Sequence, residues 1–135
     1  MIEYDFDPTQ SIATVTLSGE LGDAETLSWF WGFLDELKGA KRVSGIVDTR
    51  RPTALNVTSD AVRQMTRLAE TRDDVFEGSR WAFVATLDVV FGMARMYEIM
   101  RDQAPYEIRV FREMEVARKW FEEGARAFAK PVLTG

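Results

Sequence analysis

The chain has 135 residues, a formal net charge of -5 and a hydrophobic content of 46%, which together describe one folded domain rather than a disordered chain. This acidic balance argues against a nucleic-acid partner, since phosphate contacts need a local excess of Lys and Arg. The sequence contains neither His nor Cys, which excludes Ser-His-Asp triads, Cys-His pairs, disulfides and His or Cys zinc sites. Any chemistry must therefore come from carboxylates, from Ser-Lys or Tyr arrangements, or from magnesium held by oxygen ligands.

The first ten residues, "MIEYDFDPTQ", are acidic and lack the basic-then-apolar order of a signal peptide. The sequence also has no run of about eighteen apolar residues that would cross a bilayer. We therefore expect a cytoplasmic protein without integral membrane contact. The segment "SGELGD" contains two glycines but has neither P-loop nor Rossmann spacing, so no cofactor is expected.

Residues 2–6 and 12–19 alternate apolar and polar side chains on either side of the turn-forming "DPTQS", a pattern that predicts an antiparallel hairpin. Residues 24–38 predict a helix that ends near Gly39 and has an apolar core stripe at helical spacing. The stripe consists of Leu27, Phe30, Trp31 and Leu34.

Strands and helices alternate in the rest of the chain. The predicted strands are residues 42–49, 80–86 and 106–111, and the predicted helices are residues 58–72, 88–100 and 112–123. Residues 50–56, "RRPTALN", predict a loop, and the tail 125–135 is expected to continue the last helix to Pro131 and then fray. This order predicts a single α/β domain over residues 1–135, with an N-terminal β-hairpin followed by βαβαβα and helices packed on a mixed sheet.

The segment "RWAFVATLDVVFGMARMYEIMRDQAPYEIRVFREMEVARKWF" carries a family resemblance. Its notable residues are Asp88, Gly92, Ala94, Arg95, Tyr97 and Glu98 in the predicted helix, and Ala117 and Trp120 in the closing helix. These features resemble the STAS/SEC14-like, SpoIIAA-like proteins of bacteria, relatives of the anti-sigma-factor antagonists. The resemblance implies a STAS/SEC14-like fold and non-enzymatic action through protein contacts. It also implies an alternative, because SEC14-type relatives enclose hydrophobic ligands between helices and sheet.

In anti-sigma-factor antagonists, a serine at the start of a helix is phosphorylated within a pattern like Asp-Ser-Ser-Gly. The counterpart that the resemblance implies is Thr58, Ser59 and Asp60, with Ser59 as the acceptor of a phospho-switch. The pattern differs here, because an acidic residue stands near the acceptor position. A phosphate at a helix N-terminus is electrostatically favourable. The alternative is that these residues are only an N-cap and a first-turn acid.

The predicted helix 88–100 has an apolar arc of roughly 180°, against about 100° for an ordinary surface helix. Phe91 lies among its charged residues, and Trp29 and Phe33 form an i, i+4 aromatic pair on a flank of the first helix. Neighbouring helices, a second copy of the chain or a bound apolar ligand could cover the excess. The residues assigned to such an interface or ligand site are Trp29, Phe33, Phe91, Met93, Met96 and Met100.

Two carboxylates raise the alternative of a metal site. Asp48 and Asp88 both follow predicted parallel strands, the edge where open α/β sheets place ligands, so they could together hold magnesium. We prefer plainer roles, in which Asp88 caps a helix and Asp48 pairs with Arg50 or Arg51. No metal site is therefore predicted. Arg95 and Glu98 are likewise spaced for an ordinary intrahelical ion pair.

Together these features predict a non-catalytic cytoplasmic binding or signalling module of STAS/SEC14-like architecture. It is expected to act through protein contacts and to form a homodimer. The alternative is a SEC14-like carrier or sensor of a hydrophobic ligand such as a lipid or fatty acid.

Overall fold

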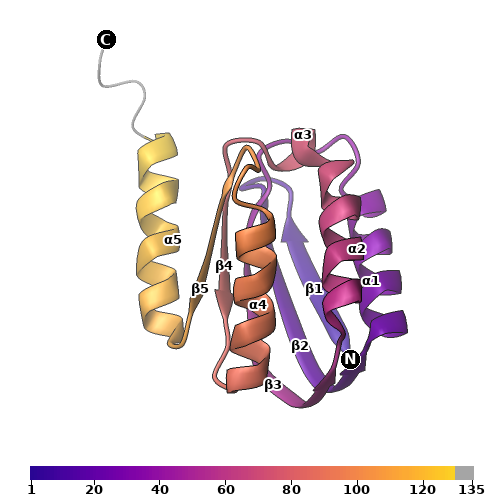
Figure 1. Cartoon of the computed structure of the whole chain (residues 1–135). Helices are drawn as coiled ribbons and strands as arrows, with labels where there is room; N and C mark the ends of the chain where they lie inside the picture. The colour runs from indigo at the N-terminus through magenta and orange to yellow at the C-terminus, as the bar shows by residue number, and fades with distance from the viewer. Residues whose placement is uncertain (130–135) are drawn as a thin grey trace.

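Five strands form one mixed sheet in the computed structural model, which describes residues 1–129 (Figure 1). The strands are β1 (Ile2–Asp7), β2 (Ile12–Gly22), β3 (Ser44–Asn56), β4 (Arg80–Val84) and β5 (Glu107–Phe111). The helices are α1 (Asp23–Glu36), α2 (Ser59–Glu70), α3 (Asp73–Phe76), α4 (Asp88–Met100) and α5 (Met114–Ala129). The predicted α/β architecture is confirmed, with the short α3 as an addition. The fraying predicted beyond Pro131 lies outside the described residues.

The strands lie in the sheet in the order of the sequence, β1-β2-β3-β4-β5. β1 pairs antiparallel with β2, and the other neighbours are parallel. Because right-handed crossovers that add strands in one direction place every connecting helix on the same face, α1, α2 and α4 share one face. α5 packs on the opposite face against β4 and β5, as Figure 1 shows.

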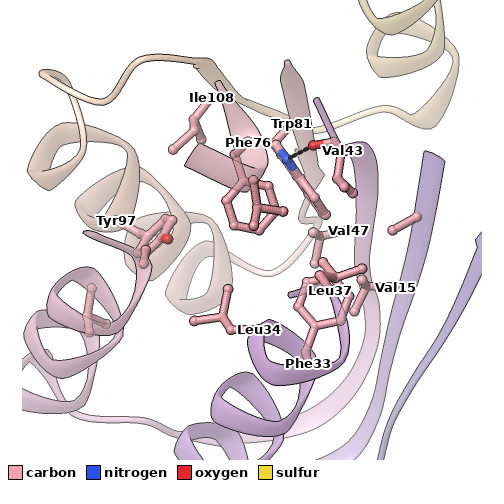
Figure 2. Close-up of a cluster of buried hydrophobic side chains, with 14 residues drawn as sticks. Val15, Phe33, Leu34, Leu37, Val43, Val47, Phe76, Trp81, Tyr97 and Ile108 are labelled. Atoms are coloured by element: carbon pink, nitrogen blue, oxygen red, sulfur yellow. Dashed lines mark hydrogen bonds between the residues drawn. The ribbon is translucent and has the colours of Figure 1, made fainter. Parts of the chain in front are cut away.

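The main core fills the layer between the sheet and the three helices that share a face (Figure 2). Its centre is Trp81 of β4, whose indole Nε1 donates a hydrogen bond of 2.9 Å to the carbonyl of Val43. The rings of Phe33 and Phe76 meet Trp81 edge-on, with centroids 6.1 and 5.6 Å away. The indole lies over Gly45 of β3, where an added Cβ would fall 2.5 Å from the ring. Gly45 therefore makes room for the central aromatic residue.

The predicted loop at residues 50–56 was wrong, because β3 continues through it. β4 pairs only with Gly45 to Asp48 of β3, so beyond that point one edge of β3 is free. A proline, which has no N–H to donate, is tolerated at a free strand edge, and Pro52 lies there, paired with Gly19 of β2. The ends of β2 and β3 therefore extend past β4 as a two-stranded ribbon.

The predicted core stripe of the first helix is confirmed at Leu34, which is buried in the core, and at Phe30, which packs against it, but was wrong at Trp31. Trp31 is 60% exposed, whereas Phe33, which we placed on a flank, is buried in the core. Trp29 stacks on Phe33 with centroids 4.8 Å apart, and Tyr4 of β1 meets Phe33 edge-on at 4.9 Å. Helix α1 carries apolar side chains on all of its faces. Which of these side chains are buried is therefore decided by contact with the β1–β2 hairpin.

Two glycine substitutions test this packing in opposite directions. Gly45→Ala should lower the free energy of unfolding by about 1–3 kcal/mol, because its Cβ would overlap the Trp81 ring and lie 2.7 Å from the Ala13 carbonyl oxygen. Gly32→Ala should raise it by about 0.5–1 kcal/mol, because the α1 backbone is helical and no atom lies within 4 Å of the new Cβ. Urea denaturation measures both, and equal effects of the two substitutions would contradict the placement of Trp81.

Candidate functional site

An apolar cavity of about 140 Å³ lies between the sheet and helices α1, α2 and α4. Its wall combines aromatic rings from every layer with aliphatic and methionine side chains. The aromatic lining residues are Trp29, Phe30, Phe33, Phe76, Trp81, Phe83, Tyr97 and Tyr106. Among the described residues, no polar atom is exposed on this wall. The cavity is therefore suited to hydrocarbon or aromatic groups rather than to charged ones.

At the carboxyl ends of the parallel strands, the cavity is lined by half-buried residues of two elements. On one side lie Leu55 and Val57, which belong to the end of β3 and the segment before α2; on the other lie Met93 and Ala94 of α4. All four side chains are half-buried. Phe83 is also half-buried, although it lies on β4, an internal strand of the sheet that a helix covers, so part of its side chain faces open space. Ligands of open α/β sheets bind at this edge. We therefore call the space between the β2–β3 ribbon and α4 the cavity mouth.

The opposite end, at the amino ends of β4 and β5, is closed by a polar network behind the apolar wall. The Arg101 guanidinium, which is almost fully buried, donates to the Asp73 carboxylate and to the Tyr106 hydroxyl at 3.3 Å. Glu70 adds a longer ionic contact of 4.0 Å. The network ties α3 to the end of α4, so this end of the cavity is fixed by charge pairing.

Burial raises the pKa of the Tyr97 phenol well above its ordinary value, and the neighbouring Tyr106 raises it further. Burial likewise raises the pKa of Tyr106, although hydrogen bonding to Arg101 works in the other direction. Both phenols are therefore neutral near pH 7 and act as hydrophobic rings with hydrogen-bonded hydroxyls. Neither is poised to act as a general base.

One buried polar atom beside the cavity has no hydrogen-bond partner among the described residues. It is the Oγ1 of Thr26, on the first turns of α1; the residue lines the cavity and is 7% exposed. An unpaired buried hydroxyl costs about 1–3 kcal/mol. Thr26 therefore combines an unmet hydrogen-bonding capacity with a position near the mouth.

The predicted interface or ligand residues divide into two groups. Trp29, Phe33 and Met93 line the cavity. Met96 and Met100 are half-buried against the core but do not line the cavity. The Met100 sulfur accepts a hydrogen bond of 3.7 Å from the Thr66 hydroxyl.

Phe91 is separate from both groups. The Arg112 guanidinium lies 4.0 Å from the centroid of its ring, and Arg112 in turn donates to Asp88. Phe91 is therefore partly covered by its own chain. Its assignment to an interface stays a prediction.

The residues of the predicted phospho-switch form the start of α2. The Thr58 hydroxyl accepts a 3.2 Å hydrogen bond from the Ala61 amide and donates to the Asp23 carboxylate at 2.7 Å. Ser59 is exposed, and Asp60 accepts a hydrogen bond from Gln64. Asp23 and Asp60 would repel a phosphate on Ser59, so this geometry favours the capping role. Phosphorylation of Ser59 stays a prediction.

Asp48 and Asp88 are held by separate arginines. The capping role predicted for Asp88 was wrong, because Leu87 is the N-cap of α4 and no side chain of the described chain caps this helix. Arg50 donates two hydrogen bonds of 2.9 Å to the Asp48 carboxylate and lowers its pKa, while Arg112 donates to Asp88. Within the described part of the chain, no group of three or more acidic, His or Cys side chains is placed to hold a metal ion. The predicted pair between Arg95 and Glu98 is confirmed.

Sequence reasoning missed several lining residues. Leu55 and Val57 fell in or beside a predicted loop, although their alternation with polar neighbours was a strand signal. Thr26 carries no such signal, because only the fold shows that its hydroxyl is both buried and unpaired.

No protein-family model matches the sequence, and no curated protein matches it. A search of solved structures finds an uncharacterized protein of the DUF3478 family with a SpoIIAA-like fold from Shewanella loihica PV-4. The two chains are 17% identical, with a TM-score of 0.59, and the match covers 89% of this chain and 93% of the other. The predicted resemblance is therefore confirmed at the level of the fold, which is SpoIIAA-like. Within residues 1–129, no helix combines the length and apolarity needed to cross a membrane.

The raised pKa of Tyr97 predicts a loss of stability at alkaline pH. Below the ordinary tyrosine pKa of about 10, both states keep the proton, but above it the unfolded state loses the proton first and is favoured. The free energy of unfolding should fall by up to about 1.4 kcal/mol per pH unit for this one group. In urea titrations between pH 10 and 11, the free energy of unfolding should fall less steeply with pH in Tyr97→Phe than in the unaltered protein. An equal slope in the two proteins would contradict the burial of the phenol.

Proposed function

We propose that the chain is a non-catalytic binding module that holds a small hydrophobic molecule in the cavity between its sheet and helices. The observation that carries this proposal is a cavity of about 140 Å³ with no polar atom exposed on the described part of its wall. An apolar cavity of this size is disfavoured when empty, because its lining lacks contacts on one side. A hydrophobic ligand would supply those contacts.

The surroundings of the cavity support binding rather than catalysis. The two phenols at its closed end are neutral, and the arginine behind them is neutralised by Asp73. Asp48 is bound by Arg50 and does not line the cavity. No acid or base is therefore presented to a molecule in the cavity. The cysteine-free sequence is compatible with the cytoplasmic location that we propose.

A second candidate function, protein contact through a homodimer, is favoured by the outer surface of α4. Val89 is 56% and Ile99 is 61% exposed. With the exposed Gly92 and the half-buried Met96, they follow the i, i+3, i+7, i+10 spacing of a coiled-coil seam. We call these four residues the α4 stripe. A soluble chain gains stability by covering such a stripe.

The α4 stripe is complementary to itself when two copies pack antiparallel. In that arrangement Val89 lies opposite the partner's Ile99, and Met96 lies opposite the hollow left by the partner's Gly92. The ion pairs beside the stripe, Arg112 with Asp88 and Arg95 with Glu98, carry no net charge. Two copies therefore approach without like-charge repulsion, although the whole chain has a net charge of -5.

Toluene tests the binding function. It should raise the thermal midpoint of the protein by a few degrees, because a ligand that binds only the folded state stabilises that state. Ala94→Phe, which places a ring in the cavity, should abolish the shift. Gly32→Ala, on a helix that also lines the cavity, adds a methyl that lies outside the cavity wall and meets no atom within 4 Å, so it should leave the shift intact. The proposal fails if toluene shifts neither the original protein nor the Gly32→Ala variant.

Sedimentation velocity tests the homodimer. The unaltered chain should sediment as a dimer, and Ile99→Asp should convert it to a monomer by burying a charge in the seam. Val116→Asp is the matched control, because Val116 is 49% exposed but lies on α5, across the sheet. A monomeric unaltered chain, or a dimer that tolerates Ile99→Asp, would contradict the interface.

A further inference from the structure

We propose that the ligand of this cavity is an electrically neutral molecule of about one ring, with a single hydrogen-bonding group that binds the Thr26 hydroxyl. Simple phenols and short-chain alcohols or ketones belong to this class. The inference rests on the proposed binding function and names the ligand class. Three observations carry it: the volume of the cavity, the lack of charge on its wall and the unpaired hydroxyl.

The volume limits the ligand. An engineered apolar cavity of roughly 150 Å³ in another protein binds benzene. The cavity between this sheet and its helices measures about 140 Å³, so it accommodates one ring or a chain of similar size. A long acyl chain would have to displace core side chains such as Trp81 and Phe33, which are almost fully buried.

The wall limits the charge. A carboxylate moved from water into an apolar site without a cationic partner is strongly disfavoured. The described lining residues include no Lys or Arg. Arg101, behind the closed end, already binds Asp73 and Tyr106 and is not part of the wall. The cavity therefore selects against fatty-acid anions.

The unpaired hydroxyl of Thr26 places the polar group of the ligand near the mouth. Its buried Oγ1 is not exposed to the cavity, so the atoms of Thr26 on the wall are carbon atoms. Threonine in a helix populates two χ1 rotamers, and a rotation between them can bring the hydroxyl to the wall. A ligand hydroxyl or carbonyl at this point would satisfy Oγ1, while its ring extends toward Trp81 and Tyr97.

Calorimetric titration of the unaltered protein and Thr26→Val with toluene, p-cresol and hexanoate tests this inference. Valine keeps the shape of threonine and removes its hydroxyl. The Kd of p-cresol should rise about five-fold in Thr26→Val, the equivalent of one neutral hydrogen bond. The Kd of toluene should change less than two-fold, and hexanoate should not bind either protein. Thr26→Val should also melt a few degrees higher, which shows that it folds and that the hydroxyl was unpaired.

The contrary outcomes separate this inference from the proposed function. If toluene and p-cresol both bind but Thr26→Val weakens neither or weakens both equally, the assignment of Thr26 is wrong and the binding function stands. If hexanoate binds as tightly as p-cresol, the selection for a neutral ligand is wrong. If neither toluene nor p-cresol binds the unaltered protein, the proposed function fails, and the ligand class fails with it.

Discussion

The handedness of its crossovers is the constraint on which the rest of this structure depends. Because β2 to β5 are added in one direction, right-handed connections place α1, α2 and α4 on one face of the sheet. The other face receives α5 alone, which covers β4 and β5. The uncovered half of that face must be polar, and Glu3, Asp5 and Thr14 are exposed there. The large apolar side chains of β1, together with Val15 and Leu17 of β2, therefore turn toward one crowded layer, whereas Ile12 lies on the α5 side near Phe121.

The side chains crowded into this layer do not fill it completely. Large rings interlock around Trp81, and the space that they leave is the cavity. Because side chains on the wall lack packing partners across this space, an apolar molecule placed there would add contacts that the chain alone does not make.

Local patterns predicted most elements of the fold, because hydrophobic periodicity reports which face of an element is buried. The helix predicted at residues 88–100 is observed with the same bounds. The patterns failed where a distant contact decides the outcome. Pro52 indicates a loop unless the free edge of β3 is known, and the sequence alone makes Trp31 as suitable a core residue as Phe33, because the contact between Tyr4 and Phe33 is made only in the fold. The cavity could not be predicted at all, because it depends on how the layers fit together.

The excess apolar surface of α4 has two explanations rather than one. Its inner side, with Val90, Met93 and Tyr97, lines the cavity, so part of the surplus faces a space within the same chain. Its outer side carries Val89 and Ile99, which the chain leaves more than half exposed (56% and 61%). A single cover, whether a ligand or a second copy, cannot account for both sides, because they point in different directions from the helix axis. The two contacts that we propose for α4 therefore use different sides of the helix, so each can be tested by substitution without disturbing the other.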